Sequence, residues 1–390
     1  MKLFPAFTPA TRLRLLTPCF ASLLGLAGCN SNTTSEQAGT TAAATDSAAM
    51  MSDTSAMAAA PRAVKPAGPA PAWAPNIAPE MLTVLEKLAS LSGPTPPEKL
   101  PVAEVRKGPS ATDATMAVMK DFGIQTPPSP LDTMSREVAP GVKARIYMPK
   151  GATGPLPVVV YYHGGGWVIA NLDTYDPSVR ALAEQTGAVF VSVAYRQAPE
   201  MKFPTAHNDS FAAYQWVLKN AASIKGDPKR VAVAGESAGG NLAAAVCMMA
   251  RDKGLMQPKH QLLVYPIAGY DLNTPSYQKN AAAKPLSKPF MAWFFDKYLR
   301  TPADGKNPMI SLVTAPNLKG LAPATVIGAG IDPLMSEGKT YADKLKAAGV
   351  PVTYKLYDNV AHEFFGMGAV VPQAKEAQAL AASELKKALQ

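Results

Sequence analysis

The segment Gly235-Glu236-Ser237-Ala238-Gly239 places a serine between small residues in the pattern G-x-S-x-G. It follows an apolar strand pattern at 231–234 and begins a helical pattern, which is the setting of a nucleophile elbow. Small neighbours let the backbone turn sharply, and the N-terminus of the following helix favours negative charge developing at the serine oxygen. A glycine-lined turn without chemistry is the alternative. The motif therefore predicts a nucleophilic Ser237 only if other segments supply its partners.

A second segment, His163-Gly164-Gly165-Gly166-Trp167, directly follows a predicted strand at 158–162. Consecutive glycines leave backbone N–H groups unobstructed and tolerate the φ values needed to aim them. Aimed donors stabilise the oxyanion of acyl transfer, with one donor worth about 3–4 kcal/mol. The segment predicts an oxyanion site in preference to a flexible loop.

A serine hydroxyl needs a base, and the base needs an orienting acid. Of the four histidines, His163 belongs to the glycine motif, and His207 and His260 lie in or beside predicted helices with a surface character. His362 follows a predicted strand at 352–357 by a short loop, on the same sheet edge as the serine. We therefore predict that His362 is the base.

Asp332 follows the predicted strand 325–329 and is the predicted acid. Glu337 is its nearest rival, but it falls within the next predicted helix. The resulting chain order of serine, aspartate and histidine is the order expected of an α/β-hydrolase.

Strands that alternate with helices must position these residues. Several strand patterns are continuous Val-rich apolar runs, as strands buried on both faces require. The predicted strands are 142–148, 158–162, 188–195, 231–234, 261–265, 325–329 and 352–357. The predicted helices are 79–91, 110–121, 176–186, 207–220, 238–251, 335–348 and 372–388. The alternation predicts a mostly parallel sheet with helices on both faces.

Other classes of function lack their signatures. His362-Glu363 begins like a zincin motif but lacks the second histidine, and Gly328-Ala329-Gly330 lacks the third glycine of a dinucleotide loop. The net charge of +9 is spread along the chain without a basic block, so we expect no nucleic-acid partner. We also expect neither a metal nor a cofactor.

The chain from about residue 79 onward resembles the bacterial hormone-sensitive-lipase-like (family IV) carboxylesterases of the α/β-hydrolase superfamily. Six collinear stretches carry the resemblance: 163–167 with 173–176, 195–200, 235–240, 265–266, 332–334 and 362–364. The resemblance implies a sheet of about eight strands and a helical cap built from about 76–131 and 270–312. It also implies that the N–H groups of Gly165, Gly166 and Ala238 form the oxyanion hole.

The same resemblance implies a serine esterase acting on small esters of short acyl chains. Four aromatic residues, three of them in the insertion at 270–312, line the substrate pocket or belong to the hydrophobic core: Trp167, Phe290, Trp293 and Phe294. A polysaccharide or xenobiotic deacetylase, an amidase, or a ligand-binding relative without catalysis remain alternatives. Two departures from the family pattern, Glu236 and Gln197, are not expected to abolish activity.

Residues 1–28 have the character of a signal peptide, with three basic residues and then an apolar run at 15–27 that is too short to span a membrane. The run ends at Leu26-Ala27-Gly28-Cys29, which resembles a bacterial lipobox and implies lipidation of Cys29. An ordinary signal peptide with an incidental cysteine is the alternative. The expected location is the bacterial cell envelope, in the outer membrane, because Asn30 is not the aspartate typical of inner-membrane retention.

Residues 29–75 are poor in large apolar side chains and rich in Ala, Ser, Thr and Pro. Such a segment buries too little apolar surface to offset chain entropy, so we expect a disordered tether. The predicted organisation is a signal peptide at 1–28, this tether, and a catalytic domain at 76–390.

Overall fold

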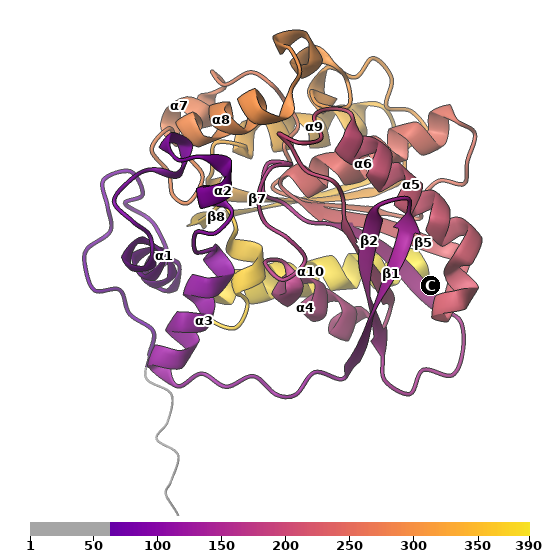
Figure 1. Ribbon diagram of the computed structural model, residues 1–390, viewed down its shortest axis with the longest axis horizontal. Helices are drawn as coiled ribbons and strands as arrows, with labels where there is room; N and C mark the ends of the chain where they lie inside the picture. The colour runs from indigo at the N-terminus through magenta and orange to yellow at the C-terminus, as the bar shows by residue number, and fades with distance from the viewer. Residues whose placement is uncertain (1–62) are drawn as a thin grey trace, which may run out of the picture. The chain divides into compact units, whose positions relative to one another are not determined.

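The computed structural model describes residues 63–390 (Figure 1). The predicted signal peptide, Cys29 and most of the predicted tether lie outside the described residues. Within the described part, no helix has the length and apolar character needed to cross a membrane.

An eight-stranded sheet forms the centre of the described chain, with strand order β1-β2-β4-β3-β5-β6-β7-β8. The strands are β1 (Leu131–Ala139), β2 (Val142–Pro149), β3 (Leu156–Tyr162), β4 (Val189–Ala194), β5 (Gly226–Glu236), β6 (Gln261–Val264), β7 (Ala324–Ile331) and β8 (Val352–Ala361). β2 pairs antiparallel with both β1 and β4, and every other pairing is parallel. The predicted α/β-hydrolase fold is confirmed.

The apolar runs in the central strands supply two cores, one on each face of the sheet. In β3, Val158, Val160 and Tyr162 belong to one buried cluster, whereas Val159 and Tyr161 belong to the other. Side chains alternate between faces along a strand, so a continuous apolar run is what a doubly covered strand requires.

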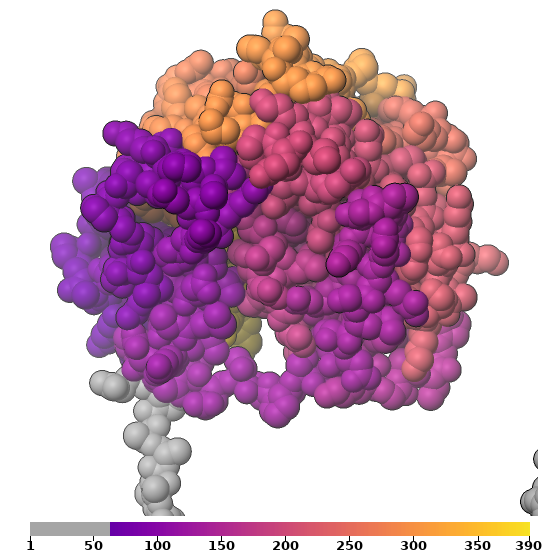
Figure 2. Space-filling model, in the orientation of Figure 1, coloured from indigo at the N-terminus to yellow at the C-terminus, as the bar shows by residue number. Residues whose placement is uncertain are grey.

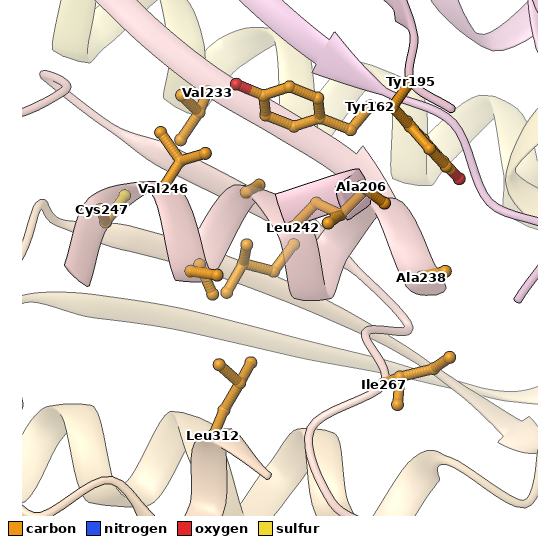
Figure 3. Close-up of a cluster of buried hydrophobic side chains, with 14 of the residues drawn as sticks. Tyr162, Tyr195, Ala206, Val233, Ala238, Leu242, Val246, Cys247, Ile267 and Leu312 are labelled. Carbon is orange, nitrogen blue, oxygen red and sulfur yellow. The ribbon is translucent and has the colours of Figure 1, made fainter. Parts of the chain in front are cut away.

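Helices cover both faces (Figure 1). The helices that follow the strands are α4 (Asp176–Thr186), α5 (Thr205–Asn220), α6 (Ala238–Asp252), α9 (Met335–Ala347) and α10 (Pro372–Leu389). α4 packs against α10 on one face, and α5 packs against α6 on the other. Figure 3 shows Leu242 and Val246 of α6 beside Tyr162 and Val233 of the sheet.

The first strand, β1, was missed by the sequence patterns. Only Leu131 and Val138 of its residues are buried, because it is an edge strand with mostly solvent-facing side chains. Strand patterns that depend on buried alternation carry little signal in such a position.

Two segments lie near the carboxyl ends of the strands and correspond to the predicted cap. The first contains α1 (Pro79–Leu91), η1 (Pro97–Lys99), α2 (Val102–Val105) and α3 (Ala111–Phe122); the second contains α7 (Pro275–Lys279), α8 (Lys288–Tyr298), η3 (Pro302–Lys306) and η4 (Leu312–Thr314). α8 packs against η1, and Figure 2 shows the N-terminal segment next to the orange segment on this face.

Arg106 joins the first cap segment to the core. Its guanidinium donates to the carbonyls of Val168 and Ala198 and forms two hydrogen bonds of 2.8 Å with the carboxylate of Glu200. This fork geometry fixes the position of the cap segment relative to the loop that follows the glycine motif.

The predicted tether is too long at its C-terminal end. Ala74 is buried, and the N–H groups of Ala67 and Gly68 donate to the Glu86 carboxylate of α1. Backbone hydrogen bonds hold this segment, together with Val64, Trp73 and Ala74, which pack on one of the two buried clusters.

Candidate active site

Ser237 sits in the sharp turn between β5 and α6. Its backbone has φ 54° and ψ −116°, a conformation that costs about 1–3 kcal/mol for a residue with a side chain. A Cβ at Gly239 would overlap the carbonyl of Tyr162, and a Cβ at Gly235 would overlap the carbonyl of Gly239. The two glycines are therefore required for α6 to approach the sheet closely enough to form this turn.

The register of β7 and β8 brings the acid and the base together. Ile331 pairs with Ala361, so the next residues, Asp332 and His362, leave adjacent parallel strands at the same edge. Asp332 Oδ2 lies 2.7 Å from His362 Nδ1, and His362 Nε2 lies 2.9 Å from Ser237 Oγ. All three side chains are buried, and Asp332 is fully buried.

Glu337, the rival acid, occupies a different place. It is buried at the start of α9, and its Oε1 accepts N–H groups from Ala268 and Gly269. Among the described hydrogen bonds it has none with His362, whereas Asp332 does. The geometry therefore favours Asp332.

The four histidines differ in their environments. Burial lowers the pKa of His163, His207 and His260 to about 4. Burial also acts to lower the pKa of His362, but the charge of Asp332 and its hydrogen bond outweigh this effect, and the net shift is upward. His362 is thus the histidine built to accept a proton.

The surface character expected for His207 and His260 is wrong. His207 is fully buried, with its Nδ1 2.8 Å from the Tyr298 hydroxyl and its Nε2 3.0 Å from Asn241 Oδ1. His260 is buried as well, and its Nε2 lies 2.9 Å from Thr325 Oγ1. The second cap segment and α6 cover the face of α5 that carries His207. A helical sequence pattern alone does not reveal these contacts.

The glycine motif forms a tight turn beside β3. Gly165 and Gly166 have φ of 92° and 57°, which L side chains rarely adopt. The carbonyl of Gly165 accepts N–H groups from Val168 and Ile169. Among the hydrogen bonds between described residues, the N–H groups of Gly165 and Gly166 do not take part. Ala238 is the first residue of α6, where backbone N–H groups are free of helix partners.

The aromatic residues suggested for the substrate pocket lie in different surroundings. Trp167 is fully buried in the core and stacks on Tyr298 with ring centroids 4.5 Å apart. Phe294 lies directly against Gly166, since a Cβ there would overlap its ring. Phe290 packs on Phe294 at 4.3 Å.

Trp293 lines a cavity of about 620 Å³ between α8 and the first cap segment. Three lysines and two acids also line it, together with apolar residues of the η1–α2 segment. Among residues 63–390, no cluster of His, Cys, Asp and Glu is arranged to hold a metal ion.

Two acids near Ser237, the buried Glu236 and the partly exposed Glu363, form hydrogen bonds with buried tyrosines, and the sequence patterns do not predict this network. The Glu236 carboxylate accepts hydrogen bonds from the hydroxyls of Tyr161 and Tyr265, and Tyr175 donates to Glu363 at 2.7 Å. The available signal was an acid that directly follows the apolar run at 231–234 and Gly235, since a carboxylate buried there requires partners.

The hydrogen-bonded series of carboxylate, imidazole and hydroxyl is suited to nucleophilic acyl transfer. The imidazole can take the hydroxyl proton as the oxygen attacks a carbonyl, and the carboxylate holds the ring and favours its protonated form. The glycine turn and the N-terminus of α6 supply N–H donors near the serine.

Comparisons with known proteins agree with this geometry. A protein-family profile described as "alpha/beta hydrolase fold" matches residues 159–366. Carboxylesterase NlhH of Mycobacterium tuberculosis is 43% identical over 251 residues, which span 64% of this chain and 79% of the relative. The ethyl acetate hydrolase of Pseudomonas putida is 33% identical over 232 residues, 59% of this chain and 73% of the relative.

Solved structures of esterases are also similar. A thermostable esterase from Pseudomonas putida ECU1011 superposes with a TM-score of 0.74 and 34% identity, covering 81% of this chain and 98% of that one. A hyperthermophilic esterase from the archaeon Pyrobaculum calidifontis superposes with a TM-score of 0.72 and 35% identity, covering 80% of this chain and 98% of that one.

Activity should fall as the pH drops through the raised pKa of His362. His362 must be neutral to accept the Ser237 proton, and its pKa is raised above 6.5. We therefore expect kcat/KM for p-nitrophenyl acetate to be constant above that pKa and to fall about tenfold per pH unit below it. A pH titration of kcat/KM checks this. An acid-limb midpoint below 6.5 contradicts the assigned environment of His362.

Proposed function

The chain belongs to the α/β-hydrolase family and is a serine carboxylesterase, and from this premise we propose that it hydrolyses esters of short acyl chains through an acyl-enzyme formed on Ser237. The observation that carries the proposal is the hydrogen-bonded series from Asp332 through His362 to Ser237 Oγ, with distances of 2.7 Å and 2.9 Å. Its members come from three different strand ends of one sheet.

In the acylation step, Ser237 Oγ attacks the ester carbonyl as His362 Nε2 takes the hydroxyl proton. His362 then donates that proton to the departing alcohol. Asp332 keeps Nδ1 protonated and stabilises the imidazolium. In deacylation, water attacks the acyl-enzyme with the same base, and the carboxylic acid leaves.

The oxyanion of each tetrahedral intermediate accepts hydrogen bonds from Gly165, Gly166 and Ala238. Support comes from the positive φ of both glycines, which turns their amides out of ordinary strand geometry. It also comes from the place of Ala238 at the N-terminus of α6. Donors fixed before the reaction need no reorganisation when charge develops, which is the main source of their effect.

The preference for short acyl chains rests on Phe294. Its ring covers Gly166, so the space beside the proposed oxyanion site is bounded by an aromatic wall from α8. A long acyl chain would have to displace this ring. A relative in Pseudomonas putida that is named as an ethyl acetate hydrolase is consistent with this preference.

An ester series tests the proposed reaction. With p-nitrophenyl esters from acetate to palmitate, we expect the highest kcat/KM among the short members. Ser237→Ala should lower turnover about 10⁴-fold or more, because the nucleophile is lost while the fold is kept. Unchanged thermal unfolding of Ser237→Ala controls for structure. A maximum at palmitate contradicts the short-chain proposal, and full turnover by Ser237→Ala contradicts the assigned nucleophile.

Shortening the aromatic wall should change chain-length preference. In Phe294→Ala, we expect the ratio of kcat/KM for long to short esters to rise about tenfold, since each methylene accommodated in an apolar pocket contributes about 1–3 kcal/mol. Phe295→Ala is the matched control, because Phe295 packs instead against Trp167 and Tyr270. An equal change of the ratio in both variants contradicts a specific role of Phe294.

We further propose that the chain is lipidated on Cys29 and anchored in the cell envelope, at the outer membrane. The support is the sequence Leu26-Ala27-Gly28-Cys29 after a short apolar run, with Asn30 next. Acyl chains on one cysteine would hold the enzyme at a membrane surface without a spanning helix.

Fractionation tests the anchor. In a Gram-negative host, we expect the full chain to sediment with outer membranes and Cys29→Ser to appear in the soluble fraction, because the thioether to lipid cannot form. Cys19→Ser, a cysteine inside the apolar run, is the control and should fractionate like the unmodified chain. Membrane association that persists in Cys29→Ser contradicts the proposal.

A further inference from the structure

Glu236, the residue before the nucleophile, is a carboxylic acid buried at the end of β5. Only 1% of its surface is exposed, and its two oxygens accept hydrogen bonds from the hydroxyls of Tyr161 and Tyr265. No arginine or lysine hydrogen-bonds to it among the described residues. Its partners are therefore neutral, and a negative charge here has no balancing cation.

Glu363 lies on the other side of the same region, directly after the predicted base. Its Oε1 lies 3.8 Å from His362 Nε2 and accepts the hydroxyl of Tyr175 at 2.7 Å. The residue has φ 70°, a left-handed conformation that is uncommon for a glutamate. This backbone turn directs the Glu363 carboxylate back toward the ring of His362.

Both carboxyl groups line one small cavity of about 10 Å³, which has room for about one water molecule. Tyr175 and Ser178 line it as well. The hydroxyl of Ser178 is buried and has no hydrogen-bond partner among the described residues. The two acids therefore share one small polar space, and the Glu363 side chain also reaches solvent, with 22% of it exposed.

Two negative charges at one small cavity repel each other, and here one of the carboxylates, Glu236, is almost fully buried. Burial, and then the charge of Glu363, raise the pKa of Glu236 to about 7. Burial raises the pKa of Glu363 as well, with opposing effects from His362 and from the Tyr175 hydrogen bond. Groups arranged in this way titrate as a coupled pair.

We propose that Glu236 and Glu363 hold one proton between them at neutral pH, and that the charge on Glu363 makes it a positioning residue that controls the basicity of His362. This inference rests on the proposed role of His362 as the base. The charge reaches Nε2, the nitrogen that faces Ser237, whereas Asp332 acts at Nδ1. The imidazolium formed during catalysis is thus stabilised from two sides.

The groups that face this pair come from five parts of the fold. Tyr161 of β3 and Tyr265 after β6 face Glu236, and Tyr175 before α4 faces Glu363. His362 faces Glu363, and Asp332 acts on it from β7 through its charge. Burial raises the pKa values of the three tyrosines well above their ordinary value, so the tyrosines stay neutral donors while the two acids and His362 change charge.

A purely structural role makes a different prediction. If the acids only tie the loops together through tyrosine hydrogen bonds, removing either charge would lower stability or turnover without moving the ionisation of His362. A change in the ionisation of His362 therefore distinguishes the two roles.

Imidazole titration by NMR of the full chain, labelled in its histidines, is the direct test. Burial lowers the pKa of three of the four histidines to about 4, whereas the pKa of His362 is raised, so the imidazole signal with the highest midpoint belongs to His362. In Glu363→Gln we expect the midpoint of His362 to move about one unit to lower pH, because a negative charge beside the imidazolium is lost. The acid limb of kcat/KM should move by the same amount.

Glu236→Gln should move the midpoint in the opposite direction. Without the repulsion from Glu236, the full negative charge resides on Glu363, so we expect a higher midpoint than in the unmodified chain. If Glu236→Gln does not fold, Tyr175→Phe replaces it. Loss of the Tyr175 hydroxyl destabilises the charged form of the Glu363 carboxylate, so we expect the midpoint of His362 to move to lower pH by less than in Glu363→Gln.

Tyr214→Phe is the matched control for loss of a buried tyrosine hydroxyl. Tyr214 donates to the carbonyl of Met256 at 2.6 Å, away from the two acids, and its removal should leave the midpoint unchanged. An unmoved midpoint in Glu363→Gln, or shifts of the same direction in Glu363→Gln and Glu236→Gln, overturns the inference. Full turnover by Ser237→Ala would overturn the proposed function instead, and the NMR titration reads the pair independently of turnover.

Discussion

Ile331 at the end of β7 pairs with Ala361 at the end of β8, so Asp332 and His362 leave the sheet side by side. Burial acts to lower the pKa of the histidine, but the charge of Asp332 and the hydrogen bond of 2.7 Å between the two side chains raise it. Ser237 Oγ must in turn lie within hydrogen-bond distance of the other ring nitrogen of His362, Nε2. The strained backbone at the β5–α6 turn places it there, and the close approach of α6 through Gly239 makes that turn possible.

Glycines at points of close contact connect the Asp332–His362–Ser237 arrangement to the rest of the site. The turn at Gly165 and Gly166 needs positive φ values, and Phe294 of α8 occupies the space that a side chain at Gly166 would need. Arg106 holds the first cap segment to the loop after this turn. Both cap segments therefore contact the loop that supplies the proposed oxyanion donors, the first through Arg106 and the second through Phe294.

Sequence patterns predicted the sheet, its helices and the residues that meet at the strand ends, because buried parallel strands and glycine motifs have strong local signals. They missed β1, whose exposed side chains leave no apolar alternation. They gave His207 a surface character although it is buried, and they did not find the acids and tyrosines around Glu236. Such contacts join segments far apart in the chain, so no local pattern encodes them.

The account depends on a Ser237 hydroxyl made nucleophilic by His362. Reaction of the full chain with a fluorophosphonate, followed by peptide mass spectrometry, tests this most directly, because the reagent phosphonylates an activated serine. The account predicts one adduct, on Ser237, that forms with a rate following the ionisation of His362 and is lost in His362→Ala. An adduct on another serine, or an undiminished rate in His362→Ala, would contradict it.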